Sequence, residues 1–97
     1  MILNDDDTVR VAAGVRVREF DGELIILDLE RGDYFGLDEV GARAWEELAY
    51  GKSPRAVAIQ LCCEYDVEEE RALADVRSLV GQLLQRGLVT VKGGGGR

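Results

Sequence analysis

The hydrophobic pattern of the chain changes its period once, at Asp38, and this change limits what the chain can fold into. Before Asp38, apolar residues alternate with polar ones or form short runs, which is typical of β-strands. After Asp38, apolar residues recur every three or four positions over long stretches, which is typical of amphipathic helices. The sequence therefore predicts an α+β domain in which a sheet is followed by helices.

Three short strands are predicted in the first part of the chain. Val15–Phe20 alternates between two faces and ends at Asp21-Gly22, a dipeptide typical of two-residue hairpin loops. Residues 23–29 are rich in Leu and Ile and are expected to form a central strand that is covered on both faces. After a turn at Glu30-Arg31-Gly32, Asp33–Leu37 forms the third strand. In this antiparallel order the third strand has one neighbour, so its other edge is expected to be free.

Capping residues divide the second part into three helices. Asp and Ser are favoured N-caps because their side-chain oxygens accept a free backbone N–H, whereas Pro suits the first turn and Gly the end. With a short terminal strand at residues 88–91, this content is that of a winged helix-turn-helix domain. The predicted helices run from the N-cap Asp38 to Gly51, from Ser53-Pro54 to about Tyr65, and from the N-cap Asp66 to Arg86-Gly87.

A chain of 97 residues with one compositional regime has room for a single domain. We therefore treat residues 1–97 as one domain that is ordered over about residues 9–91. Residues 1–7 are expected to be a frayed tail, and the glycine-rich residues 93–97 are expected to be a flexible end. Neither tail is expected to carry function.

The composition disfavours an enzyme. Histidine is absent, which removes the commonest general base and the commonest metal ligand. Cys62 and Cys63 are adjacent, a spacing that suits neither a disulfide framework nor a zinc site with four ligands. The carboxylates of residues 5–7 and 68–70 lie in solvated runs rather than in a pair suited to acid–base catalysis. We therefore expect no catalytic residues, no metal and no cofactor.

The charge balance bears on partners and location. Twelve Lys and Arg against nineteen Asp and Glu give a net charge of −7. A negative surface lacks the counterion release that dominates nucleic-acid affinity, so we expect no nucleic-acid partner. No run approaches the roughly 18 to 20 apolar residues that a membrane span needs, and the N-terminus is acidic where a signal peptide is basic. The expected location is the cytoplasm, with no membrane span.

A resemblance to the PqqD-like family rests on two stretches, LIILDLERGDYFGLDEVGARAWEEL and ADVRSLVGQLLQRGLV. It spans about residues 15–91. Members of that family are compact winged-helix domains that bind the leader peptides of ribosomally synthesised, post-translationally modified peptides. The resemblance therefore implies a non-catalytic recognition element that binds a leader segment and delivers the precursor to a partner leader peptidase or modifying enzyme.

Within the family, the free-standing form, the length and the run from Glu30 to Trp45 look most like the leader-binding protein of lasso-peptide biosynthesis. A peptide chaperone that serves a radical enzyme in pyrroloquinoline quinone synthesis would look similar, so both alternatives stay open. A winged-helix DNA-binding regulator and an adaptor for a folded protein surface are further alternatives. We expect a monomer, with the free strand edge as a route to dimers.

The candidate peptide site combines the free strand edge with the third helix, because an extended peptide adds to an unpaired edge through backbone hydrogen bonds. Adjacent strand residues point to opposite faces, so one of Tyr34 and Phe35 faces the groove and the other does not. The apolar helix residues also fit an ordinary core face. The candidate peptide-binding residues are Asp33, Tyr34, Phe35, Gly36, Leu37, Asp75, Val76, Arg77, Leu79, Val80 and Leu83.

Overall fold

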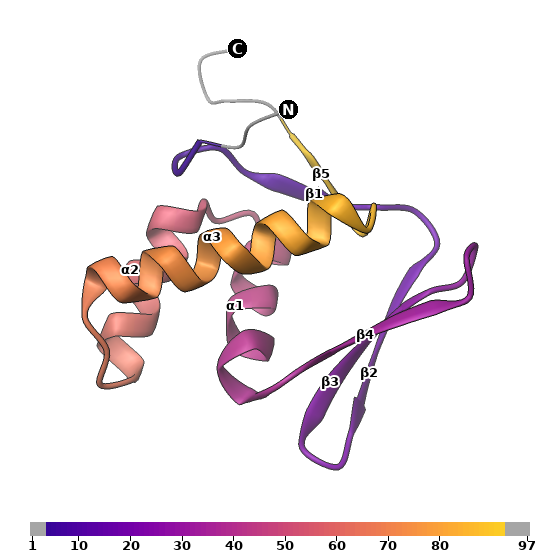
Figure 1. Ribbon diagram of the computed structural model, residues 1–97, viewed down its shortest axis with the longest axis horizontal. Helices are drawn as coiled ribbons and strands as arrows, with labels where there is room; N and C mark the ends of the chain where they lie inside the picture. The colour runs from indigo at the N-terminus through magenta and orange to yellow at the C-terminus, as the bar shows by residue number, and fades with distance from the viewer. Residues whose placement is uncertain (1–3, 93–97) are drawn as a thin grey trace.

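The computed structural model describes residues 4–92 (Figure 1). Within this range it has a three-stranded antiparallel sheet, a separate two-stranded sheet and three helices. The prediction of an α+β domain with a three-stranded sheet followed by three helices is confirmed. In chain order the elements are β1 (Val9–Val11), β2 (Val15–Phe20), β3 (Glu23–Asp28), β4 (Asp33–Leu37), α1 (Glu39–Tyr50), α2 (Pro54–Glu64), α3 (Glu69–Gln85) and β5 (Val89–Val91).

The three-stranded sheet has the order β2-β3-β4. Asp21 and Gly22 form the expected hairpin loop, with φ angles of 54° and 83°, both positive as a type I′ turn requires. β3 pairs with β2 on one side and with β4 on the other. Among residues 4–92, no strand pairs with the second edge of β4, so the expected free edge is present.

The second sheet joins the two ends of the described chain (Figure 1). The expected terminal strand is present as β5, and it pairs antiparallel with β1 so that Val9 lies opposite Val91. β1 was not predicted, because three residues are too few to show a period. Val9 and Val89 are nevertheless buried in the core, so the small sheet closes one side of the domain.

Two of the three N-cap residues predicted from the sequence cap their helices in the structure. The Asp38 carboxylate accepts a hydrogen bond from the backbone N–H of Gly41 at 2.8 Å, and the Ser53 hydroxyl accepts one from Ala56 at 3.2 Å. The prediction that Asp66 caps the third helix was wrong. α3 begins at Glu69, with Glu68 as its N-cap, because Val67 packs against the core in an irregular segment that delays the helix.

The core lies between the inner face of the three-stranded sheet, the helices and the β1–β5 pair. Trp45 in α1 is buried, as expected for the single tryptophan. The large side chains with almost no exposed surface come from both sheets and all three helices, so burial of apolar area holds these elements together. They are Ile26, Leu48, Pro54, Val57, Val76, Val80, Leu83 and Val89.

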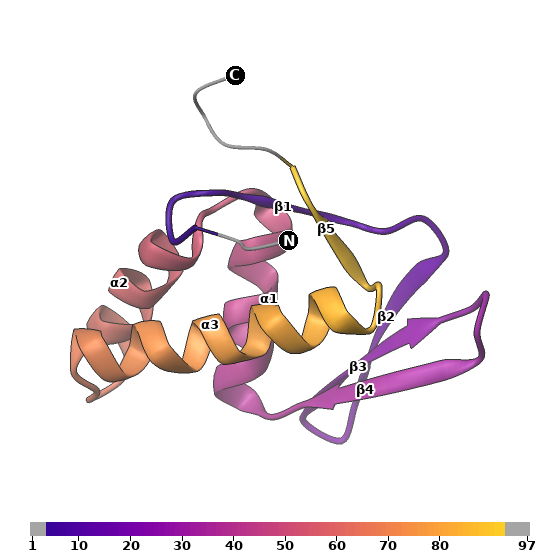
Figure 2. The ribbon, with the colours of Figure 1, turned by 45° about the horizontal axis from the view of Figure 1, so that its top comes forward.

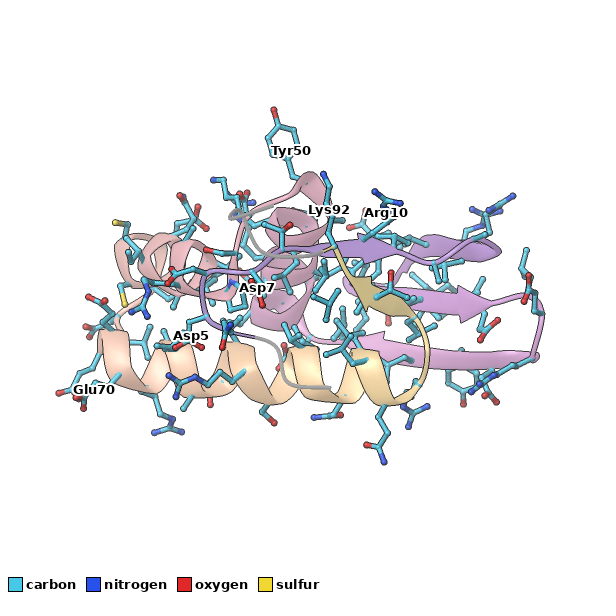
Figure 3. All side chains as sticks on the ribbon, turned by 90° about the horizontal axis from the view of Figure 1, so that it is seen from above. Asp5, Asp7, Arg10, Tyr50, Glu70 and Lys92 are labelled. Carbon is cyan, nitrogen blue, oxygen red and sulfur yellow. The ribbon has the colours of Figure 1, made fainter. Side chains whose placement is uncertain are left out.

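Residues 4–7 do not form the expected frayed tail. Asp5 lies beside α3 (Figure 3). Its carboxylate contacts Arg77 in α3, with oxygens 2.8 Å from Nε and 2.6 Å from Nη2. The Asp5 carbonyl accepts a hydrogen bond from the backbone N–H of Arg55 in α2. Asp6 contacts the Arg55 side chain at 3.0 Å. The segment therefore ties α2 to α3. Residues 1–3 of the expected tail and residues 93–97 of the expected flexible end lie outside the described range.

The Asp5 contact predicts a pH-dependent loss of stability in Asp5→Asn. The hydrogen bond from Arg77 holds the pKa of Asp5 below its ordinary value of 3.8. The ionised form therefore contributes stability that is fully present above pH 3.8 and is lost as the pH falls through the lowered pKa. We expect a fall in Tm of a few degrees at pH 7 that shrinks below about pH 4, measured by circular dichroism.

The matched control is Asp66→Asn, because Asp66 is exposed and has no ion-pair partner among residues 4–92. An equal fall in Tm in both variants would contradict a specific role for Asp5.

Candidate functional site

A groove of about 520 Å³ runs between β4 and α3. One wall is β4 and the start of α1, the other wall is α3, and the end of α2 closes one end. The lining is mainly apolar, with a few polar side chains from the N-cap of α1, the end of α2 and α3. The residues that line it are Phe35, Gly36, Leu37, Asp38, Val40, Gly41, Ala44, Leu61, Tyr65, Val67, Ala72, Asp75, Val76, Ser78, Leu79 and Gln82.

The alternation of β4 decides which of its side chains enter the groove. Phe35 lies opposite the buried Ile26 of β3, so it shares the inner face and lines the groove. The Arg86 guanidinium lies over the Phe35 ring, 4.9 Å from its centroid, which fixes the ring through a cation–π contact. Tyr34 points to the other face and is 70% exposed. Phe35 therefore faces the groove and Tyr34 does not, which answers the question that the sequence left open.

The backbone groups of β4 that face the free edge follow from the hairpin. A two-residue loop is closed by a hydrogen-bonded pair, here Phe20 and Glu23, and such pairs then alternate along the strands. The bond from Leu29 N–H to the Gly14 carbonyl, at 3.1 Å, fits this alternation. It follows that Glu23, Ile25 and Leu27 direct their backbone groups to β2.

The same alternation carries over to β4. Leu24, Ile26 and Asp28 direct their backbone groups to β4, where they meet Leu37, Phe35 and Asp33. The N–H and C=O groups of Tyr34 and Gly36 therefore point to the free edge. An added Cβ at Gly36 would meet only Ile25 Cδ1, at 3.7 Å on the opposite face of the sheet, so only the backbone of Gly36 borders the groove.

The α3 wall combines an apolar floor with a polar rim. Ala72 and Val76 are buried and Leu79 is half-buried, and they lie three or four positions apart on one helical face. Asp75, Ser78 and Gln82 are exposed along the adjacent edge of the same helix. The arrangement offers apolar contacts to one side of a bound chain and hydrogen-bonding groups to the other side.

The far end of the groove is the part that the sequence did not reveal. It is closed by Leu61, Tyr65 and Val67 from the α2–α3 region, and by Val40 and Ala44 from α1. The two groups are separated by 17 positions at their nearest members, Ala44 and Leu61, so no local spacing marks them as a set. Partial burial raises the pKa of Tyr65, whose hydroxyl lies 3.5 Å from the Glu39 carboxylate.

Five of the eleven candidate residues are absent from the groove lining. Val80 and Leu83 are 1% and 0% exposed and belong to the core, as the alternative interpretation of the helix face allowed. Arg77 turns away to contact Asp5, and Tyr34 lies on the other face of the sheet. Asp33 is exposed at the start of β4. The candidates that line the groove are Phe35, Gly36, Leu37, Asp75, Val76 and Leu79.

Residues 4–92 show neither a cluster of metal-binding side chains nor a membrane-spanning helix. Among residues 4–92, no group of three or more Cys, Asp or Glu side chains is placed to hold a metal ion. Within the same range, no helix has the length and apolar character that crossing a bilayer demands. The groove is formed by the free backbone edge of β4, apolar side chains and a polar rim.

Comparison with known proteins assigns the fold. The family model described as "Coenzyme PQQ synthesis protein D (PqqD)" matches residues 23–89, which include both walls of the groove. The chain belongs to the PqqD family. The resemblance noted from the sequence is thus confirmed.

Two solved structures of similar proteins contain a leader peptide. One is described as TbiB1 in complex with the TbiA(beta) leader peptide, with 33% identity, a TM-score of 0.76, and coverage of 87% of this chain and 95% of that chain. The other is a lasso peptide synthetase B1 complexed with the leader peptide, with 32% identity, a TM-score of 0.79, and coverage of 84% and 96%. No curated protein sequence matches this member of the PqqD family.

Two helical glycines give a matched test of the groove wall. An added Cβ at Gly41 would lie 3.2 Å from both the Asp38 carboxylate and Leu37 Cδ2, whereas at Gly81 it would meet nothing within 4 Å. Gly81→Ala should stabilise the protein by about 0.5–1 kcal/mol because Ala favours helix. Gly41→Ala should lower Tm, because it displaces a cap or a buried leucine. Thermal melts of both variants check this, and an equal gain in the two would contradict it.

Proposed function

We propose that this member of the PqqD family is a non-catalytic recognition element for a ribosomally made precursor in lasso-peptide biosynthesis. It binds the leader segment in the β4–α3 groove by strand addition and delivers the precursor to a separate leader peptidase or modifying enzyme. The observation that carries the proposal is the free β4 edge beside an apolar groove, in a chain similar over most of its length to two proteins solved with leader peptides.

Backbone pairing supplies the first part of the interaction. A peptide strand beside β4 would exchange hydrogen bonds with the N–H and C=O groups of Tyr34 and Gly36. The five residues of β4 span about 16 Å at the usual strand rise, which accommodates about five residues of peptide. This pairing does not depend on the leader's side chains, so it fixes the peptide's path rather than its identity.

Side-chain contacts supply the second part. Alternate residues of a bound strand would point down onto Phe35, Val76 and Leu79. The far end, closed by Leu61 and Tyr65, suits one large apolar side chain of the leader. The peptide class that fits is an extended segment with apolar residues at alternate positions and at least one aromatic or branched residue.

The proposed mechanism is tethering. A bound leader holds the rest of the precursor near the enzyme, which raises its effective concentration without any chemical step in this chain. The absence of histidine from the sequence is in keeping with a partner that supplies the chemistry. We place the process in the cytoplasm, where ribosomal precursors are made.

A second candidate function is favoured by the description of the matched family. In that alternative the chain would act as a peptide chaperone for a radical enzyme in coenzyme PQQ synthesis. The two functions share the groove and differ in the precursor that is bound. We favour lasso-peptide biosynthesis over the second candidate because both solved structures named above contain a leader peptide, and one of these proteins is named as a lasso peptide synthetase.

Calorimetric titration with synthetic leader segments of precursors encoded beside the gene tests the function directly. Saturable binding with a Kd in the micromolar range or tighter, unchanged when the core segment is removed, would support it. Binding only to a precursor of the PQQ type would support the second candidate. If no leader segment binds to the folded protein, the proposal is wrong.

Strand addition itself is tested at Gly36. Gly36→Pro removes one of the two N–H groups that face the free edge and leaves the β3 pairing of Phe35 and Leu37 in place. We expect leader binding to weaken at least about fivefold, since a lost backbone hydrogen bond costs about 1 kcal/mol and the ring obstructs the edge. Gly36→Ala is the control, because it keeps the N–H and its Cβ has room. Equal affinity of both folded variants would argue against strand addition.

The apolar floor is tested by two leucines of α3. Leu79 lines the groove and is half-buried, so Leu79→Ala should weaken leader binding about tenfold with a modest fall in stability. Leu83 is fully buried outside the lining, so Leu83→Ala should cost about 2–5 kcal/mol of stability with little effect on the affinity of the folded fraction. Denaturant unfolding and calorimetry on both variants separate the two effects, and the reverse pattern would contradict this assignment.

A further inference from the structure

The face of the three-stranded sheet that points away from the groove forms a second surface, which we call the outer face. Register places Arg16, Leu27 and Tyr34 side by side across the three strands, with Arg18 and Ile25 in the next row. These side chains alternate with Val17, Ile26 and Phe35, which face the core. The outer face consists of Arg16, Arg18, Phe20, Glu23, Ile25, Leu27 and Tyr34.

The outer face is apolar and uncovered within residues 4–92. The sequence predicted that residues 23–29 would be covered on both faces, and this was wrong for the outer one. Ile25 and Leu27 are only half-buried, Tyr34 is 70% exposed and Phe20 is 73% exposed. In Figure 2 the sheet extends away from the helices. A contiguous group of apolar side chains that stays exposed is the kind of patch that marks an interaction surface.

The outer face carries two arginines against one glutamate, Glu23, in a chain whose net charge is −7. Arg16 and Arg18 are exposed and have no carboxylate within ion-pair distance among the described residues. Their guanidinium groups donate only to the neighbouring backbone carbonyls of Val15 and Val17. By contrast, Arg43, Arg55 and Arg77 are each paired with acidic side chains. Two unpaired arginines beside apolar side chains complement a surface that is apolar and bordered by carboxylates.

A second copy of the chain is a poor occupant for this face. A twofold interface would place the same patch of each copy against the other. The two copies would then bring four arginines, Arg16 and Arg18 of each, against only two carboxylates, those of Glu23. The charge therefore favours a different protein.

We propose that the outer face is the docking surface for a folded partner protein with an apolar patch bordered by Asp and Glu. The inference rests on the proposed function, in which that partner is the enzyme that acts on the precursor. A tethering module must hold the leader and the enzyme at the same time, so it needs two surfaces that do not overlap. β4 supplies both, because Phe35 and Leu37 face the groove while Tyr34 faces outward.

The test uses the purified chain and the leader peptidase or modifying enzyme encoded beside it, with binding measured by calorimetry. Arg16→Glu/Arg18→Glu should weaken enzyme binding about tenfold, and added salt should weaken the wild-type interaction. The affinity for the leader segment should not change. The control is Arg10→Glu/Lys92→Glu, which alters net charge equally at exposed residues of the β1–β5 region (Figure 3).

The apolar part is tested separately with two exposed tyrosines. Tyr34→Ala should weaken enzyme binding, whereas Tyr50→Ala, at the end of α1 on a different part of the surface, should not (Figure 3). Both side chains are largely exposed, at 70% and 85%, so neither variant should unfold the protein.

Enzyme binding that is equal in the wild type and Arg16→Glu/Arg18→Glu would overturn the proposal, as would an equal loss in the Arg10→Glu/Lys92→Glu control. Self-association of the wild type that disappears in Arg16→Glu/Arg18→Glu, seen by sedimentation, would also overturn it by assigning the face to a second copy. Failure of the wild type to bind any leader segment would refute the proposed function instead. In that case, loss of enzyme binding in the Arg16→Glu/Arg18→Glu variant would still identify the docking surface.

Discussion

The alternation of side chains and backbone groups along β4 is the constraint on which both surfaces of this protein depend. One neighbour, β3, takes the backbone groups of Asp33, Phe35 and Leu37, which leaves those of Tyr34 and Gly36 at the free edge. The same alternation sends Phe35 and Leu37 toward α3 and Tyr34 away from it. A shift of one residue in the β3–β4 register would exchange every one of these roles, so the hairpin loops that set the register also define the site.

The sequence predicted the elements well because their signals are local. A positive-φ dipeptide, an N-cap and a proline in a first helical turn each act within a few residues, and β2, β3, β4, α1 and α2 formed close to where they were expected. The start of α3 was missed because packing of Val67 overrode the capping preference of Asp66. Local preferences are weak compared with burial of an apolar side chain.

The site was only partly predictable because it depends on contacts between distant residues. The apolar stripe of α3 is real, but the sequence does not tell which of its members face the core and which face the groove. Val80 and Leu83 proved to be core, whereas Leu79 lines the groove. Arg77 was expected to meet a peptide, yet its partner is Asp5, 72 positions away. Neither the far end of the groove nor the role of residues 4–7 has a local signature.

The distribution of charge separates a peptide-binding element from a winged-helix DNA-binding regulator. A recognition helix needs cations that are free to meet phosphates and bases. In α3, Arg77 is paired with Asp5 and Arg71 with Asp75, and the helix begins with Glu69 and Glu70. Arg16 and Arg18, which have no ion-pair partner among residues 4–92, lie instead on the sheet, beside apolar side chains that a DNA backbone would not cover. In the function that we propose, the fold serves as two protein-binding faces on one small sheet, and binding at the groove leaves the outer face open. Under this proposal the two sites do not compete, so holding a leader and an enzyme together converts their encounter into an intramolecular step. A domain of 97 residues would thereby promote a reaction whose chemistry its partner supplies.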